Sequence, residues 1–210
     1  MKRVLRAALT QTVDAFREMP RRAADLGRLK DRLGDIRAAN LEHNIALIRA
    51  ARARGAEIIC LGELFASPYF ALEKNPMWRA LAEDAATGPS VRILRQTAAD
   101  LKLIIVAPIY ELDARTGKRF NAAVVIDEKG RVLGKYRKTH IPEGANEKGC
   151  FTETFYYGRG EGRPNSPSTA ILGKNPHFPV FQTTAGKIGV AVCYDRHFEG
   201  GVRALARAGA

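Results

Sequence analysis

Three polar residues at the ends of three β-like runs constrain the fold of this chain more than any other feature. Glu63 lies in IICLGELF, Lys138 in VLGKYRKTHIP and Cys193 in KIGVAVCYDRHF, and the intervals between them are 75 and 55 residues. Intervals of this length exclude a local turn motif and a local metal motif. The three side chains can meet only if the strands that carry them lie side by side, so the meaning of the pattern depends on the fold.

The apolar pattern predicts alternating strands and helices. Residues 56–61 form a short continuous apolar run, as expected of a strand buried on both faces. An apolar stripe from residue 41 to residue 51 predicts a helix that ends at Gly55, and residues 14–40 before it read as a charged insertion of loop and helix. The remaining predicted strands cover residues 4–12, 103–110, 120–127, 131–136, 180–184 and 187–193, and the remaining predicted helices cover residues 89–101 and 197–208.

Turn and loop signals complete an α/β outline. Glu128-Lys129-Gly130 predicts one hairpin turn, and Ala185-Gly186 predicts another. Residues 139–179 are rich in Gly, Pro, Asn and Ser and too long for a simple connection, which makes them a candidate binding loop. With 210 residues and 46% hydrophobic content, the chain is expected to bury one core as a single domain over residues 1–210.

The net charge of +12 and the pI of about 10.0 fit a nucleic-acid-binding protein, so the distribution of the charge matters. Acidic residues interleave with the arginines between residues 17 and 54, as on a solvated helical face. A module that stacks bases needs aromatic side chains within its basic surface, and residues 14–40 contain only Phe16. We therefore expect no nucleic-acid partner. No apolar run approaches the roughly 18 residues of a membrane span, so we expect no membrane partner either.

The cysteines and histidines indicate a cytoplasmic protein without a metal site. The three cysteines are odd in number and widely spaced, and we expect no secretory signal before them, which favours a reducing compartment. The four histidines show no paired zinc spacing and have no CxxC partner. Gly158-Arg159-Gly160-Glu161-Gly162 lacks the strand-then-helix context of a dinucleotide-binding loop.

Cys193, Glu63 and Lys138 supply the groups that break a carbon–nitrogen bond through a covalent intermediate. A thiol on a strand-to-helix turn is open to substrate, and the helix start favours its thiolate. Each residue also has a structural interpretation: a buried cysteine, a helix N-cap or surface salt bridge for Glu63, and a charged strand end for Lys138. A dyad of Cys193 with His197 or His140 is a further alternative.

The chain resembles the nitrilase superfamily of carbon–nitrogen hydrolases, because GELFASPYF, YRKTHIPEG and GVAVCYDRHFEG match the three motif regions of that family in order. The resemblance implies an αββα sandwich that pairs into a four-layer homodimer or a larger homo-oligomer. It assigns Glu63 as the base, Lys138 as the oxyanion partner and Cys193 as the nucleophile. A second glutamate of the amidase branches aligns with Glu153 in FTETFYY. No cofactor is implied.

RKTHIPEG, FTETFYYG, PVFQT and CYDRHF are most similar to β-ureidopropionase and related N-carbamoyl amidases, which act on small ureido or amide substrates. In that branch Arg196 would hold the substrate carboxylate, although an ion pair with Asp195 or Glu199 is the structural alternative. The backbone N–H of Tyr194 would join Lys138 at the oxyanion, and His140 would line the substrate site. A simple aliphatic amide or a carbamoyl polyamine is the alternative substrate.

The C-terminal sequence suggests that the chain is incomplete. Residues 206–210 resemble the helix end before residues 56–61, yet no strand follows them, so we expect the last strands and helices of the fold to be lacking. Residues 158–177 are also longer than the matching loop of compact carbamoylputrescine amidases. A catalytically silent fragment is therefore an alternative to an active hydrolase.

Overall fold

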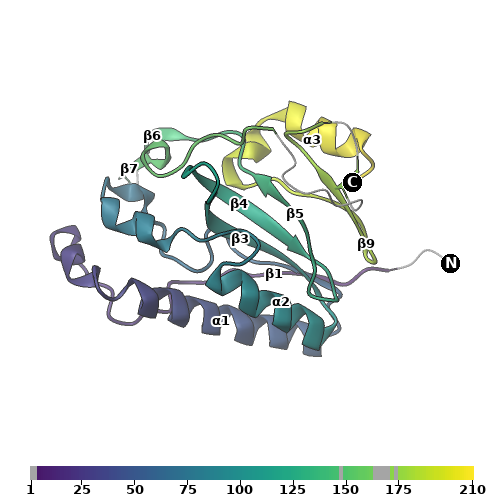
Figure 1. Ribbon diagram of the computed structural model, residues 1–210, viewed down its shortest axis with the longest axis horizontal. Coiled ribbons are helices and arrows are strands. Elements are labelled where there is room, and N and C mark those ends of the chain that lie inside the picture. Colours follow the sequence, from purple (N-terminus) through teal and green to yellow (C-terminus); the bar gives the residue numbers. More distant parts are fainter. Residues whose placement is uncertain (1–3, 147–148, 163–170, 173–174) are drawn as a thin grey trace.

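The computed structural model describes residues 4–146, 149–162, 171–172 and 175–210, and these form a mixed α/β fold (Figure 1). Its central sheet has five strands in the order β1-β2-β3-β4-β5. The first three strands are parallel, and β4 and β5 complete the sheet as an antiparallel hairpin. Their bounds are Ala7–Leu9 (β1), Ile58–Cys60 (β2), Ile104–Leu112 (β3), Arg119–Ile126 (β4) and Val132–Arg137 (β5).

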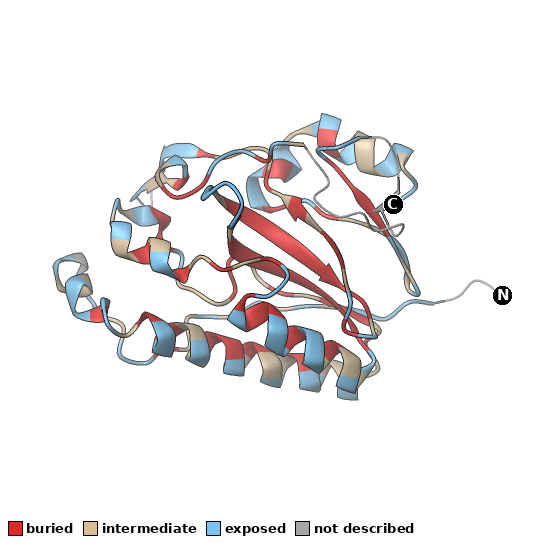
Figure 2. Cartoon of the chain, viewed as in Figure 1, coloured by how far each residue is buried: buried red, intermediate tan, exposed pale blue. Residues whose placement is uncertain are grey.

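Two helices, α1 (Leu33–Ala53) and α2 (Pro89–Leu101), cover one face of this sheet. Their apolar side chains pack on alternate residues of the strands, including Ile59, Ile105 and Val124, in one continuous core. Figure 2 shows the buried strands in red and the exposed outer sides of the two helices in pale blue. The helices therefore hold the sheet rigid from one side and leave its other face for a second layer.

A smaller sheet and the last helix lie beyond the other face. The strands β8 (Ile171–Leu172), β9 (Val180–Thr183) and β10 (Gly186–Gly189) pair in the order β10-β9-β8, and α3 spans Glu199–Arg207. Phe181 and Val190 pack against Ile104 and Val125 of the central sheet, and Leu205 of α3 joins the same core. Two packed sheets thus stand between helices, and functional side chains can approach from both sheets.

Short elements connect the two layers and surround the ends of the central strands. The strands β6 (Glu143–Asn146) and β7 (Gly149–Thr152) form a separate hairpin. The described part of the chain also has five 3₁₀ helices, at Ala23–Leu29 (η1), Phe70–Leu72 (η2), Pro76–Leu81 (η3), Glu153–Phe155 (η4) and Cys193–His197 (η5). None of the helices in the described ranges is long and apolar enough to cross a membrane.

Several predicted boundaries are wrong. The helix predicted from residue 41 begins at Leu33, so it takes in the end of the supposed insertion at residues 14–40. The first strand is limited to Ala7–Leu9, and the last predicted strand ends at Gly189, four residues before Cys193. Residues 139–179 are not an irregular loop throughout, because they contain β6, β7, η4 and β8. Part of that segment, residues 147–148, 163–170 and 173–174, lies outside the described residues.

Candidate active site

Lys138 is the centre of a buried cluster of charges. Its Nζ lies 2.9 Å from Glu63 Oε1 and 2.7 Å from Glu153 Oε2, and its side chain is 0% exposed. The residue follows β5 directly and its backbone N–H donates to the carbonyl of Asn121 on β4. Burial lowers the pKa of Lys138, but the two carboxylates outweigh burial and raise that pKa above its ordinary value. The lysine therefore stays a cation.

Glu63 and Lys138 meet although the strands that precede them, β2 and β5, are not adjacent. After β2, the N–H of Leu61 donates to the carbonyl of Val106 and the N–H of Phe65 to the carbonyl of Pro108, so the segment that carries Glu63 continues alongside β3. The expectation that the strands carrying the three residues lie side by side is wrong. Strands β3 and β4 stand between β2 and β5, and β10 belongs to the other sheet. The site forms where the two sheets face each other.

Glu153 enters the cluster from η4, and it is 1% exposed. Its second oxygen, Oε1, accepts a hydrogen bond of 2.8 Å from the hydroxyl of Tyr69. Asn121 on β4 donates to Glu63 Oε1 at 2.7 Å and lies 3.5 Å from the hydroxyl of Tyr157. The sequence-based prediction gave these three polar partners no role. Tyr69 lies within GELFASPYF and Tyr157 within FTETFYY without a known task there, and Asn121 lies within an ordinary strand.

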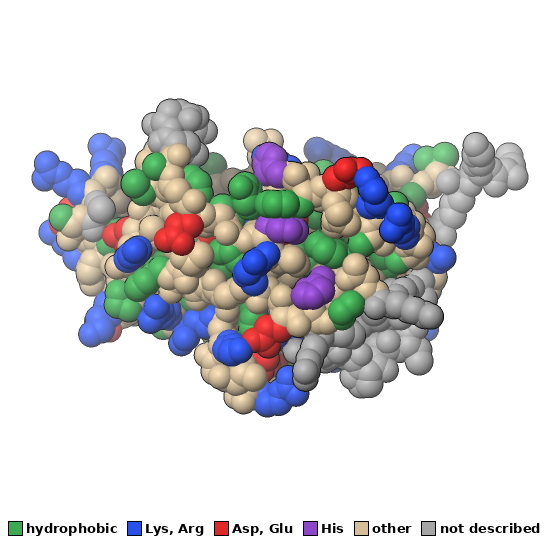
Figure 3. All heavy atoms as spheres, turned by 90° about the horizontal axis from the view of Figure 1, so that it is seen from above, with side chains coloured by type: hydrophobic (Ala, Val, Ile, Leu, Met, Phe, Trp, Pro, Cys, Tyr) green, Lys and Arg blue, Asp and Glu red, His purple; other side chains and the backbone are tan. Residues whose placement is uncertain are grey.

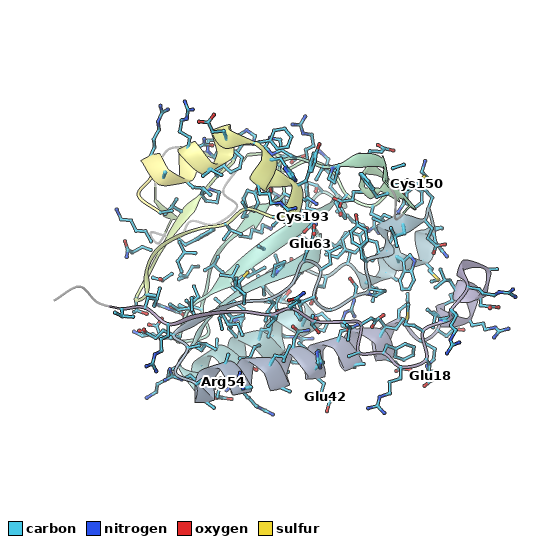
Figure 4. All side chains as sticks on the ribbon, turned by 180° about the vertical axis from the view of Figure 1, so that it is seen from behind. Glu18, Glu42, Arg54, Glu63, Cys150 and Cys193 are labelled. Carbon is cyan, nitrogen blue, oxygen red and sulfur yellow. The ribbon has the colours of Figure 1, made fainter. Side chains whose placement is uncertain are left out.

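Cys193 is the first residue of η5 and has a backbone φ of +47°. A left-handed conformation at a residue other than glycine costs roughly 1–2 kcal/mol, so the surroundings must hold it in place. The residue is exposed, and Figure 4 shows it next to Glu63 and distant from Cys150. The thiol thus lies on a turn that leads into a helix, as predicted, although the strand before it ends at Gly189 and the helix is a 3₁₀ helix.

Although Cys193 as a whole residue is exposed, desolvation of its thiol and the neighbouring carboxylate of Glu63 raise the pKa of Cys193 to about 11, and Lys138 opposes this only in part. The prediction that the helix start favours the thiolate is wrong for this chain. Two carboxylates, which raise the pKa of the thiol, lie near the sulfur, and only one ammonium group there lowers that pKa. The free thiol is therefore protonated at neutral pH and must transfer its proton to a base when it reacts.

The other predicted site residues occupy different positions. His140 hydrogen-bonds to Asp195 through its ring Nδ1, 2.8 Å from Oδ1, and stacks on Phe198 at 3.6 Å. This contact replaces the suggested His140–Cys193 dyad. The ring of Tyr194 lies 5.4 Å from that of His197, so the second dyad candidate packs on an aromatic side chain.

Arg196 is exposed and makes no ion pair within the described part of the chain. The carboxylate of Asp195 binds His140 instead, and Glu199 pairs with Arg203. The structural alternative for Arg196 thus loses both of its proposed partners. Figure 3 shows the molecule from above the view of Figure 1. On that face, lysine and arginine side chains are scattered among acidic and apolar ones and do not gather into one patch. Among the described residues, no group of three His, Cys, Asp or Glu could hold a metal ion.

Comparisons with known proteins identify the family of this chain. The family model described as carbon-nitrogen hydrolase matches residues 35–210. The chain is 36% identical to the beta-ureidopropionase of Arabidopsis thaliana over 152 residues, which are 72% of this chain and 33% of that protein. It is 32% identical to the N-carbamoylputrescine amidase of the same plant over 190 residues, which are 90% of this chain and 57% of that protein.

Solved structures show the same fold. A carbon-nitrogen hydrolase from Helicobacter pylori G27 superposes with a TM-score of 0.66 at 26% identity, over 83% of this chain and 52% of that one. Nit3 of Saccharomyces cerevisiae, a member of branch 10 of the nitrilase superfamily, superposes with a TM-score of 0.64 at 27% identity, over 83% of this chain and 56% of that one. The chain spans between a third and about three fifths of the length of these relatives. The resemblance predicted from the three motifs is confirmed, and the chain belongs to the carbon–nitrogen hydrolases of the nitrilase superfamily.

Proposed function

We propose that this protein hydrolyses a non-peptide carbon–nitrogen bond of a small amide or ureido compound through a covalent bond to Cys193. The observation that carries the proposal is the buried ammonium group of Lys138 held between Glu63 and Glu153, beside a thiol on a strained turn. The carboxylate can act as a base, the fixed cation as an oxyanion partner and the thiol as a nucleophile.

In the first half of the reaction, Glu63 takes the thiol proton while sulfur attacks the carbonyl carbon. The electron pair of the C=O bond moves to oxygen, where Lys138 and the backbone N–H of Tyr194 stabilise the negative charge. The tetrahedral intermediate collapses, the C–N bond breaks and the amine leaves with the proton from Glu63. An acyl or carbamoyl group then remains on the sulfur.

In the second half, Glu63 takes a proton from water, with Glu153 orienting the site, and the hydroxide attacks the same carbon. The C–S bond breaks and the thiol recovers its proton from Glu63. An amide substrate gives an acid. An N-carbamoyl substrate gives the free amine, and the carbamate that is released decomposes to ammonia and carbon dioxide.

We further propose an N-carbamoyl amino acid, such as N-carbamoyl-β-alanine, as the substrate. The names of the matched relatives support a carbamoyl substrate, and the exposed Arg196 has no ion-pair partner in the described ranges, which suits a substrate carboxylate. Carbamoyl polyamines and aliphatic amides are the alternatives, and a polyamine would be favoured by acidic groups in the pocket. Arg196→Ala should raise KM for the anionic substrate and leave KM for a neutral amide unchanged.

The order of helices and sheets in this chain supports the αββα sandwich of the family, and we propose that it associates as a homodimer or a larger homo-oligomer. Association through the layers would give the four-layer arrangement. Multi-angle light scattering at several protein concentrations measures the assembly directly, and a monomer at all concentrations would contradict this part of the proposal.

The covalent intermediate provides the test of the function. The chain is mixed with N-carbamoyl-β-alanine or a simple amide, quenched in acid and digested, and the mass of the peptide containing Cys193 is measured. We expect a carbamoyl or acyl adduct on Cys193, and its loss together with nearly all turnover in Cys193→Ser. The matched control Cys150→Ser alters another exposed cysteine and should keep both. Unchanged turnover in Cys193→Ser would defeat the proposal, and an inert wild-type chain would favour the silent alternative.

A further inference from the structure

Asp195 stands out among the buried groups that the proposed chemistry does not use. It lies two residues after Cys193, is 1% exposed, and its carboxylate meets four polar contacts. Oδ2 accepts hydrogen bonds from Val192 N at 3.0 Å and from the Tyr136 hydroxyl at 2.6 Å. Oδ1 accepts from the backbone N–H of His140 at 2.9 Å and lies 2.8 Å from the ring Nδ1 of the same residue. A carboxylate accepts up to four such bonds, so Asp195 is saturated.

These contacts join the two segments that carry the thiol and the cation. Tyr136 and His140 flank Lys138 at two residues on either side, whereas Val192 directly precedes Cys193. The two segments belong to different sheets and are otherwise more than 50 residues apart in sequence. One carboxylate therefore holds the backbone before the thiol and the backbone around the cation at a fixed separation.

The neighbouring rings leave this carboxylate little freedom. The ring of His140 stacks on Phe198 with an interplanar angle of 5°, and the ring of Tyr136 stacks on Phe178 at 5.9 Å. The N–H of Phe198 in turn donates to the carbonyl of Asp195. The left-handed conformation of Cys193 lies inside this frame, between Val192 and Asp195. A strained residue persists only where its surroundings over-determine it.

We propose that Asp195 is a positioning residue, which locks the strained turn of Cys193 and sets the separation between its thiol and Lys138. The inference rests on the proposed function only for its effect on turnover, because the geometry of the thiol can be measured without a substrate. The charged and titratable groups around the sulfur are Glu63, Lys138, Glu153 and Tyr69. A shift of the turn changes the distance from the thiol to all of them.

Asp195→Asn with Asp127→Asn as its control tests the proposal. The amide keeps the shape of the side chain but turns one acceptor into a donor, so it cannot satisfy all four contacts. Asp127 is 3% exposed and likewise accepts backbone N–H groups, from Lys129 and Arg131, but it lies in the β4–β5 turn away from the thiol. The two variants remove comparable buried interactions at different places.

Two measurements on the folded variants separate positioning from simple structural support. The first is the hydrogen-exchange rate of the Val192 and His140 amides, which should rise on the order of tenfold in Asp195→Asn and stay unchanged in Asp127→Asn. The second is the alkylation rate of Cys193 by iodoacetamide against pH, with Cys150 as internal reference. Its apparent pKa should move from about 11 toward the ordinary thiol value in Asp195→Asn only.

The result that would overturn the proposal is faster exchange at Val192 in Asp195→Asn with an unchanged alkylation profile of Cys193. If Asp195→Asn does not fold, the same measurements are made on variants of its partners. Tyr136→Phe removes the hydroxyl that donates to Asp195, and His140→Asn is compared with His140→Ala. Asn can offer an amide N–H close to the position of the histidine Nδ1, so His140→Asn should keep the wild-type profile and His140→Ala should lose it. Equal profiles in these two variants would also overturn the proposal. An inactive wild-type chain would refute the proposed function and leave these alkylation results interpretable.

Discussion

At the scale of single residues, the notable feature is a fully buried lysine that keeps its charge. Lys138 loses its hydration on burial, which by itself favours the neutral amine, and Glu63 and Glu153 reverse that preference. Desolvation raises the pKa of the neighbouring thiol, and the same two carboxylates raise that pKa further. The cluster thus holds a cation beside a thiol that is protonated at neutral pH.

Glu153→Gln tests how far the carboxylate of Glu153 contributes to the raised pKa of the Cys193 thiol and to turnover. The substitution keeps the shape of the side chain and removes one negative charge near the sulfur, so the apparent pKa of Cys193 should fall below about 11. Turnover should fall by on the order of 100-fold, because water is no longer oriented by a carboxylate. Alkylation against pH and steady-state kinetics measure the two effects. Glu143→Gln, which changes an exposed glutamate of β6, should alter neither. A thiol pKa that rises in Glu153→Gln would contradict this account.

At the scale of elements, the end of β5 is held by a close contact with the segment after η4. The N–H of Gly160 donates to the carbonyl of Lys138 at 2.9 Å. A Cβ at Gly160 would lie 2.5 Å from the carbonyl oxygen of Arg137, whereas a Cβ at Gly158 would meet nothing within 4 Å. The first glycine is therefore required by the close approach of two backbones, and the second is not.

Gly160→Ala should displace the strand end that carries Lys138. A displacement of about 1 Å at a catalytic group can cost on the order of 100-fold in rate, so we expect a loss of this size in kcat with a smaller change in KM. Gly158→Ala is the matched control two residues away and should keep wild-type kinetics. Equal rates in the two variants would show that the Gly160 contact does not position Lys138.

The helical layer beneath the sheet is expected to govern stability and not chemistry. Leu94 of α2 is fully buried in the core against the central sheet, and Ile93 beside it is 44% exposed. Leu94→Ala should lower the free energy of unfolding by about 2–5 kcal/mol, and Ile93→Ala should change it by less than about 1 kcal/mol. Urea unfolding followed by circular dichroism measures both. Similar costs would show that the helix is not packed as described.

At the scale of the whole molecule, several groups bind their protons more tightly in the folded chain than in the unfolded chain. Burial raises the pKa of Tyr110, and burial together with Glu153 raises the pKa of Tyr157. The pKa values of Cys193 and Lys138 are also raised, as described above. A group with a raised folded pKa stabilises the fold fully below its unfolded pKa. That contribution is lost as the pH rises toward the folded value. The ordinary values of these groups are 9.0 for the thiol, 10.0 for tyrosine and 10.5 for lysine.

The free energy of unfolding should therefore be nearly constant from about pH 7 to pH 8.5 and fall steadily above about pH 9. Urea titrations at half-unit pH steps measure the curve. Tyr110→Phe removes one of the titrating groups and should make the fall shallower at high pH, at a small cost in stability near neutrality. A stability that stays level up to pH 10.5 would contradict the raised pKa values.

The sequence by itself determined the family and most of the elements. The three motifs identify Glu63, Lys138 and Cys193, and apolar periodicity finds α2 at its observed bounds and the β4–β5 hairpin within one or two residues. These features succeed because residue type and local spacing are properties of short segments. The start of α1 at Leu33 was missed because charged residues interrupt the apolar stripe in its first turns. The helix nevertheless begins there, because Leu33 and Ile36 pack in a separate apolar cluster.

Only the tertiary structure decided how the reactive groups meet. The sequence does not show that Glu63 meets Lys138 although β2 and β5 are not adjacent, that the thiol follows the second sheet, or that Asn121 and Tyr69 bind the two glutamates. It likewise led to the wrong direction for the thiol pKa, since that direction depends on how many carboxylates surround the sulfur. Distances between segments far apart in sequence and the loss of water on burial arise when the two sheets pack, and no local pattern records them.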